Sequence, residues 1–351
     1  MAINVAEDVA PVRADEHMDW PSLEHWLKQH IDGLTGPMSV AQFHGGHANL
    51  TYCVSFCDYD LVVRRQPHGD IPPGAHDMAR EHRVLSALGK AFPPAPASLA
   101  YCEDNSVIGA PFVVMERKYG VVIRDHIPAA LAVHENVEQR VSMALIDAMA
   151  ALHSIVPADI GLEKLGRPEG FVSRQLAGWN KRWELACSEE VPLFAEIYQH
   201  LLATQPESSH ACIVHNDLKL DNCMFAPDNP DQVSAIFDWD MATLGDPLVE
   251  LGTLLSYWRE AGDKLHRAPT IELDMDRFPT RAELVERYAR SGIEITHIDW
   301  YEAFGHWKHA VVLQQLYRRF ATGQTKDSRL GALKPNIAIT LGVARAVLSK
   351  V

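Results

Sequence analysis

The sequence contains no long apolar run. None of its 351 residues lies in a stretch that approaches the ~18 consecutive apolar residues of a membrane-spanning helix. The amino terminus also lacks the basic start of a secretory signal, because it carries Glu7, Asp8, Asp15, Glu16 and Asp19. We therefore expect a cytoplasmic protein with no membrane partner.

Cysteine is sparse and scattered. The six cysteines form no CxxC pair and show none of the dense spacing of a disulfide-stabilised domain. Cys53 and Cys57 are the only close pair. On one strand they would lie ~13 Å apart, which is too far for a disulfide or a shared tetrahedral metal. We expect all six thiols to be reduced and most of them to serve packing.

Basic residues are outnumbered, with 32 Lys and Arg against 46 Asp and Glu and a formal net charge of −14. A nucleic-acid surface needs clustered basic residues, so we expect no nucleic-acid partner. The charge is compatible with a cationic substrate or a metal-bound nucleotide. The sequence also lacks the GxxxxGK[ST], GxGxxG and GxSxG motifs, which excludes P-loop, Rossmann and α/β-hydrolase sites.

Hydrophobic residues make up 47% of the sequence, and the chain is longer than the size at which a single hydrophobic core usually stops growing. We therefore expect two lobes. An arm and a leading helix, capped by Asp19, are predicted over residues 1–35. Short β-branched runs and glycine turns predict a β-rich lobe over 36–115, with one helix that Asp77 caps. Beyond residues 116–120, helical spacing dominates 121–351, apart from a hairpin near 223–237. The predicted class is α+β.

The most informative segment is His215-Asn216-Asp217-Leu218-Lys219-Leu220-Asp221-Asn222, which is followed by Asp238. Two carboxylates and one carboxamide thus flank the predicted hairpin, whose ends converge. Mg²⁺ prefers one or two such oxygen ligands together with phosphate and water, which makes Asn222 and Asp238 candidate metal ligands. Asp217 would be free to accept a hydroxyl proton. This division of roles is typical of phosphoryl transfer.

Together with Asp238-Trp239-Asp240 and Gly245-Asp246-Pro247, this segment resembles the aminoglycoside phosphotransferase and choline kinase superfamily, which is related to the protein kinases. The resemblance is closest to a branch also found fused to acyl-CoA dehydrogenases, and it extends from about Phe43 to about Leu255. The branch is indicated by Gly45-Gly46-His47-Ala48-Asn49-Leu50-Thr51-Tyr52, Leu61-Val62-Val63-Arg64-Arg65 and Phe171-Val172-Ser173-Arg174-Gln175. It implies a two-lobed protein-kinase-like fold, with a small β-rich N-lobe and a larger, mainly helical C-lobe, that binds ATP and Mg²⁺.

The resemblance also implies a nucleotide site. It assigns a phosphate-covering turn to Gly45, Gly46, His47 and Asn49, although such a turn could also exist without a ligand. Arg64 stands where the family usually has a lysine, and Glu81 is its expected ion-pair partner. Arg65 could exchange roles with Arg64, or both arginines could lie on the surface of an edge strand.

The hinge and the base pocket follow from the same resemblance. Met115 corresponds to the back of the adenine pocket and residues 116–120 to the hinge between lobes. Peptide groups of Glu116 and Lys118 would bind the base; a plain linker is a compatible reading.

Several residues around Asp217 receive roles by the same comparison. His215 is expected to order the loop, and Lys219 to neutralise the transferring phosphoryl group unless it is a solvated loop lysine. Asp240 could add a metal contact if the strand continues past Asp238, or form a structural hydrogen bond. Asp246 is expected to cap a helix, and Glu250 occupies a position where relatives often have an acid.

The predicted function is ATP- and Mg²⁺-dependent transfer of a phosphoryl group to a hydroxyl of a small molecule. The acceptor could be an aminoglycoside or a hydroxyacyl thioester; Asn216, at a position where aminoglycoside-modifying members commonly have glycine, argues against the former. An inactive nucleotide-binding protein is the alternative. Acceptor selection is expected from residues 174–183 and 300–319. His306 and His309 lack a third ligand for a metal, and a homodimer is possible.

Overall fold

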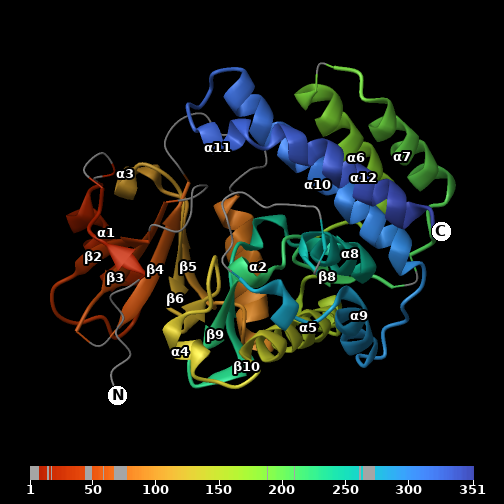
Figure 1. The fold of residues 1–351 in the computed structure, drawn as a ribbon. Helices are drawn as coiled ribbons and strands as arrows, with labels where there is room; N and C mark the ends of the chain where they lie inside the picture. The colour runs from red at the N-terminus through yellow and green to blue at the C-terminus, as the bar shows by residue number, and fades with distance from the viewer. Residues whose placement is uncertain are drawn as a thin grey trace. The chain divides into compact units, whose positions relative to one another are not determined.

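The computed structural model describes residues 8–13, 16, 18–43, 50–57, 59–66, 77–187, 189–208, 210–260, 262–263 and 273–351. The chain forms two compact units (Figure 1). The first contains residues 1–119 together with the short segment 237–240, and the second contains 120–236 and 241–351. The boundary at residues 119–120 falls inside the predicted hinge. A small β-rich unit thus precedes a larger, mostly helical one, as the sequence predicts.

The first unit is built on a six-stranded antiparallel sheet with strand order β1-β2-β3-β4-β6-β5. The strands are β1 (Val9–Ala10), β2 (Ser39–Phe43), β3 (Leu50–Ser55), β4 (Asp60–Arg65), β5 (Ser98–Cys102) and β6 (Phe112–Glu116). The helices are α1 (Trp20–His30), α2 (Met78–Ala91) and α3 (Asn105–Ile108). Each of the two predicted caps is present: Asp19 accepts the Ser22 N–H, and Asp77 accepts the Arg80 N–H.

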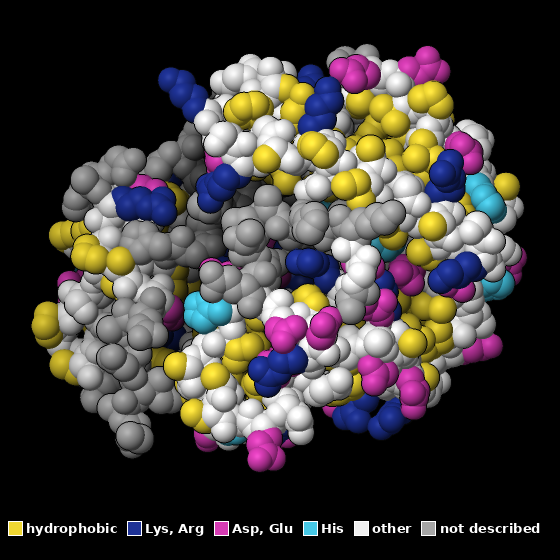
Figure 2. All heavy atoms as spheres, viewed as in Figure 1, with side chains coloured by type: hydrophobic (Ala, Val, Ile, Leu, Met, Phe, Trp, Pro, Cys, Tyr) yellow, Lys and Arg dark blue, Asp and Glu magenta, His cyan; other side chains and the backbone are white. Residues whose placement is uncertain are grey.

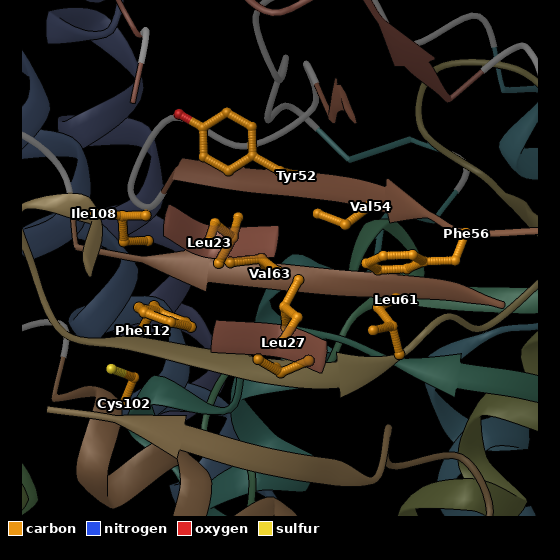
Figure 3. Close-up of a cluster of buried hydrophobic side chains, with 11 residues drawn as sticks. Leu23, Leu27, Tyr52, Val54, Phe56, Leu61, Val63, Cys102, Ile108 and Phe112 are labelled. Atoms are coloured by element: carbon orange, nitrogen blue, oxygen red, sulfur yellow. The ribbon is translucent and has the colours of Figure 1, made fainter. Parts of the chain in front are cut away.

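The two faces of this sheet carry different elements. Leu61 and Val63 of β4 point to the face where Leu23 and Leu27 of α1 complete an apolar core (Figure 3). Because side chains alternate along a strand, Arg64 points to the opposite face, toward α2. The buried stripe of α2 consists of Met78, Glu81, Val84, Leu85 and Leu88. The strand register therefore decides which arginine meets Glu81.

One element of the first unit differs from its prediction. Part of the segment expected to form an arm is instead the edge strand β1, with Val9 opposite Phe43 and Ala10 opposite Gln42. Next to it, Asp8 forms an ion pair with the buried guanidinium of Arg117 at 2.9 Å. A two-residue strand has too short a pattern to be recognised from sequence, and here the pairing partners and the ion pair define it.

The second unit contains two small sheets and most of the helices. The sheets have the orders β10-β9-β7 and β11-β8, formed by β7 (Val121–Val122), β8 (Cys212–Val214), β9 (Cys223–Ala226), β10 (Asn229–Ile236) and β11 (Thr243–Gly245). The predicted hairpin is β9–β10, with Cys223 opposite Ile236. Strand β11, which pairs with β8, was not predicted, because a run of three residues that ends in glycine is too short to show a strand pattern.

The helical part consists of α4 (Ala129–Ala132), α5 (Val137–His153), η1 (Pro157–Ile160), α6 (Phe171–Ala186), α7 (Pro192–Ala203), η2 (Leu220–Asn222), η3 (Trp239–Met241), α8 (Pro247–Tyr257), η4 (Met275–Arg277), α9 (Arg281–Ala289), α10 (Ile298–Ala321), α11 (Ser328–Gly331) and α12 (Lys334–Leu348). Helix α10 packs against α6, α8 and α12 (Figure 1). None of the helices in the described ranges has both the length and the apolar character needed to cross a membrane.

Two glycines allow α8 and α10 to approach backbone to backbone. A Cβ added to Gly252 would lie 2.3 Å from the Tyr301 carbonyl oxygen, and one added to Gly305 would lie 2.4 Å from that of Gly252. Such distances are far inside van der Waals contact, so only glycine fits at this crossing. The crossing brings Glu250 of α8 and Lys308 of α10 to the same loop, described below.

On the face drawn in Figure 2, the described Lys and Arg side chains are scattered among acidic and apolar ones.

Candidate functional site

The loop between β8 and β9 holds the predicted base, Asp217. Its preceding residue, Asn216, has φ 69°, a left-handed conformation that glycine or asparagine adopts more readily than other residues. The Asn216 side chain donates to the Met241 carbonyl at 2.9 Å, and its N–H donates to Glu250 at 2.6 Å. The asparagine therefore keeps the turn that glycine would allow and adds a side-chain hydrogen bond.

Asp217 accepts two hydrogen bonds within its own loop. Its Oδ2 receives the Lys219 ammonium at 3.0 Å and the Asn222 amide at 2.9 Å. The same amide group donates to the Asp217 backbone carbonyl at 2.8 Å, so the side-chain carbonyl oxygen of Asn222 is the atom that could bind a metal. The Asp217 side chain is 23% exposed, so the predicted base is accessible to solvent while these hydrogen bonds fix its orientation.

Lys219 is a paired cation and not a freely solvated loop lysine. Burial by itself would lower the pKa of Lys219, but the carboxylates of Asp217 and Asp221 raise it above its usual value. Its Nζ also lies 5.8 Å from the centre of the Tyr257 ring. An ammonium group thus stands beside the base, where the sequence predicted it, and its contact with a phosphoryl group remains a prediction.

Glu250 holds the backbone of the loop 215–222 in place. Its carboxylate is buried and accepts the backbone N–H groups of both His215 and Asn216, at 3.0 and 2.6 Å. It also contacts His153 Nε2 at 2.8 Å, and His153 Nδ1 contacts the Tyr288 hydroxyl at 2.6 Å. Burial alone would raise the pKa of Glu250, but the contacts with His153 and His215 lower it below its usual value. Glu250 is therefore held as a carboxylate.

His215 has the loop-ordering contacts that the sequence predicted. It is fully buried, its N–H is held by Glu250, and its Nδ1 accepts the Asp217 N–H at 3.3 Å. The roles of Glu250, His153 and Tyr288 were not predicted, because the three come from α8, α5 and α9. The available signal was a single carboxylate inside the otherwise apolar helix 247–257. Asp246 caps this helix by accepting the Leu248 N–H at 2.8 Å, as predicted.

In the first unit, Arg64 stands among three carboxylates. Its guanidinium contacts Glu81 at 2.8 Å, Asp238 at 3.2 Å and Asp240 at 3.3 Å. The predicted ion pair with Glu81 is thus confirmed. Arg65 points to the other face of β4, where its side chain donates to the Ile108 carbonyl at 2.7 Å. This orientation excludes an exchange of roles between the two arginines.

The charges in this cluster do not balance. Burial alone would lower the pKa of Arg64, but Glu81, Asp240 and Asp238 raise it. Burial raises the pKa of Glu81 to about 7; Arg64 opposes this shift, and Asp240 and Asp238 add to it. Three carboxylates around one guanidinium leave excess negative charge, which a divalent cation would compensate. The Asp238 side chain is 46% exposed and can reach such an ion.

Asp240 does not meet the condition under which the sequence predicted it as a second metal contact. The strand does not continue past Asp238: β10 ends at Ile236, and Asp238 has φ 67°. The turn that follows, η3, carries Asp240 to Arg64, while the Arg80 guanidinium donates to the Asp240 carbonyl at 3.0 Å. A structural contact, the other alternative, is therefore present. Among the described residues, no group of three or more His, Cys, Asp or Glu could hold a metal, so Mg²⁺ would depend on phosphate and water for its other ligands.

The predicted base-binding segment lies at the end of β6. Met115 is buried, and the Glu116 N–H donates to the Ala97 carbonyl at 3.0 Å. Any contact between Glu116 and a base would therefore use its carbonyl group. The Glu116 carboxylate accepts the Ala97 N–H at 2.8 Å and pairs with Lys118 at 2.7 Å, which orders the backbone where Lys118 could offer its N–H. Gly45, Gly46, His47 and Asn49 lie outside the described residues.

His306 and His309, which the sequence predicts to serve packing more than metal binding, both pack inside the protein. His306 is buried and lies 3.6 Å from Glu302, and the His309 ring packs edge-on against Tyr257 with centroids 4.8 Å apart. The described residues around them supply no third metal ligand. Between these histidines, Lys308 is buried, a residue that sequence reasoning did not select.

Removing the Arg64 guanidinium should strongly destabilise the first unit. Arg64→Met would leave Glu81 buried without its cation, so we expect the free energy of unfolding to fall by about 3–5 kcal/mol. Urea denaturation followed by tryptophan fluorescence measures this difference. Arg83→Met, at an exposed position of the same helix, is the matched control and should change stability by less than about 0.5 kcal/mol. Equal stability of the two variants would contradict the proposed dependence of Glu81 on Arg64.

Comparison with known proteins agrees with this geometry. The model of the phosphotransferase enzyme family (APH) matches residues 39–304. Acyl-CoA dehydrogenase family member 11 of Rattus norvegicus is 31% identical over 365 residues, and the match covers 100% of this chain but 46% of the rat protein. The chain thus spans less than half the length of this relative.

Solved structures show the same fold. A Ralstonia eutropha protein assigned to the aminoglycoside phosphotransferases has a TM-score of 0.78 and 30% identity, covering 94% of this chain and 99% of its own. The choline kinase of Cryptosporidium parvum has a TM-score of 0.65 at 10% identity, covering 93% of this chain and 96% of its own. An aminoglycoside phosphotransferase solved with AMP-PNP and hygromycin B has a TM-score of 0.58 at 16% identity, covering 93% of this chain and 98% of its own. These similarities confirm the predicted kinase-like fold.

Proposed function

Because the chain belongs to the phosphotransferase enzyme family, we propose that it transfers the γ-phosphoryl group of ATP to a hydroxyl group of a small molecule with the aid of Mg²⁺. The observation that carries this proposal is the loop 215–222, in which Asp217 and Asn222 are bonded to each other and oriented by the buried Glu250. In the proposed reaction, this short segment would supply both the base and a metal ligand.

We assign a role in this reaction to each of the residues described above. Asp217 orients the acceptor hydroxyl and takes its proton as the oxygen–phosphorus bond forms, while ADP leaves with the electrons of the broken bond. Asn222 and Asp238 would hold Mg²⁺, which neutralises phosphate charge when bound. Arg64, held by Glu81, binds phosphate oxygens, and Lys219 adds positive charge beside the base.

The acceptor is proposed from the relatives. The rat protein is named an acyl-CoA dehydrogenase family member, so a hydroxylated acyl thioester is our first candidate, and an aminoglycoside is the second. A polypeptide acceptor is disfavoured, because the segment between Asp238 and Gly245 is occupied by η3 and β11 and contains no long activation loop. The main alternative function is nucleotide binding without turnover.

Measurement of ATP hydrolysis tests the proposed function. We expect the purified chain to hydrolyse ATP slowly without acceptor, to lose this activity when EDTA removes divalent cations, and to recover it on addition of Mg²⁺. A panel of hydroxyacyl-CoA compounds, aminoglycosides and choline should then identify an acceptor that accelerates ADP release. Tight nucleotide binding with no hydrolysis, with or without any acceptor, would instead support the binding protein.

A further inference from the structure

Lys308 is a buried cation with very few partners. It lies on α10, is 5% exposed, and has one hydrogen bond within the described part of the chain, to the Asn216 carbonyl at 3.4 Å. An ammonium group carries three donors, and a buried charge is costly unless its donors are satisfied. Two N–H groups of Lys308 therefore have no hydrogen-bond acceptor among the described residues and could bind a ligand.

Lys308 shares the Trp179 ring with a second cation. Its Nζ lies 5.3 Å from the centre of the Trp179 ring, and the Arg182 guanidinium lies 4.4 Å from the same ring. Among the described residues, neither cation forms an ion pair with a carboxylate. The two nearby carboxylates are already engaged, Asp217 by Lys219 and Asn222, and Glu250 by His153 and two backbone N–H groups.

The balance of charges agrees with this geometry. Burial lowers the pKa of Lys308 to about 8; Asp217 and Glu250 raise it, whereas Arg182 and Lys219 lower it further. An ammonium group in such a place is stabilised by a bound oxygen and is not satisfied by the protein alone.

Lys308 lies next to the backbone of Asp217, the proposed base. The carbonyl that Lys308 contacts belongs to the peptide bond joining Asn216 to Asp217. A small molecule whose hydroxyl reaches Asp217 therefore places its neighbouring atoms near the Lys308 ammonium. A cationic group there would be repelled by Lys308 and Arg182, whereas an acyl oxygen would be bound.

We propose that Lys308 binds an acyl oxygen of the acceptor, either the carboxylate of a hydroxy acid or the carbonyl of its thioester, and thereby selects against cationic acceptors. This proposal rests on the proposed function and names its substrate class. Arg182, across the Trp179 ring, adds to the same preference.

Three probes of the same carbon chain test the proposal: β-hydroxybutyrate, β-hydroxybutyryl-CoA, and the corresponding amino alcohol. Their binding to the full chain is measured by calorimetry with Mg²⁺ and AMP-PNP present. We expect the wild type to bind at least one acyl probe roughly 10–100-fold more tightly than the amino alcohol, the range of a charge-assisted hydrogen bond. The first two probes distinguish the carboxylate from the thioester.

The variants separate this role from a structural one. Lys308→Met should abolish the preference for acyl probes, and Lys308→Arg should retain part of it. Lys164→Met, at an exposed position outside the two segments expected to select the acceptor, should leave the preference unchanged. Equal binding of acyl and amine probes by the wild type, or of neither, would overturn the proposal. So would a preference that survives Lys308→Met. Mg²⁺-dependent ATP hydrolysis by the wild type, measured in parallel, shows whether the proposed function itself has failed.

Discussion

Asp217→Asn should lower kcat for phosphoryl transfer by roughly 10²–10⁴-fold, the usual contribution of a positioned acid or base. The amide can still accept hydrogen bonds from Lys219 and Asn222 through its oxygen, so the loop should keep its shape. It cannot accept the proton of the acceptor hydroxyl. We therefore expect a large loss of kcat with little change in the affinity for Mg-ATP, measured by single-turnover transfer and by nucleotide titration.

The control for this variant lies in the same loop. Asp221→Asn removes a carboxylate that is 39% exposed and 3.9 Å from Lys219, and so tests the effect of charge alone. It should change kcat far less than Asp217→Asn does. Wild-type turnover by Asp217→Asn, or equal losses in the two variants, would remove Asp217 as the base.

Glu250→Gln should lower the free energy of unfolding by roughly 2–4 kcal/mol and kcat with it. One carboxamide oxygen can accept the Asn216 N–H, but the NH₂ group then faces the His215 N–H or His153, so that two donors meet. The loop that carries Asp217 loses one of its two backbone anchors. Urea unfolding and initial rates measure the two effects, and Glu286→Gln, exposed on α9, is the control.

The stability lost in Glu250→Gln should depend on pH. Because the pKa of Glu250 is lowered in the folded protein, its contribution to stability is present above the ordinary pKa of a glutamate, about 4.3, and is lost as pH falls below it. The stability difference between the wild type and Glu250→Gln should therefore narrow on acidification. A difference that stays constant from neutral to acidic pH would show that Glu250 is not held as a carboxylate.

The sequence predicted those features whose signals lie close together along the chain. The helix after Asp77 was predicted with its cap, and the family resemblance indicated Glu81 as the ion-pair partner of Arg64. The hairpin 223–236 and the loop motif before it follow from local patterns of turns and apolar runs. The choice between Arg64 and Arg65 needed the strand register, which only the paired sheet supplies.

The features that escaped prediction depend on distant parts of the chain. Glu250 and His153 are 97 positions apart, and Lys308 reaches a loop 92 positions before it. Within a 24-residue helix rich in aromatic residues, nothing in the local pattern separates a buried lysine from one at the surface. Tertiary packing, through the glycine crossing of α8 and α10, assigns these residues to the loop.

Asn216 has a consequence for the thermodynamics of the proposed reaction. Its N–H, carbonyl and side chain are all engaged, by Glu250, Lys308 and Met241, in a left-handed backbone conformation that asparagine tolerates better than most residues do. Compared with glycine, asparagine also restricts the unfolded chain, so less conformational entropy is lost when the turn forms. The loop is thus ordered when the chain folds. In the proposed reaction, binding energy from the acceptor would then remain available to stabilise the transition state.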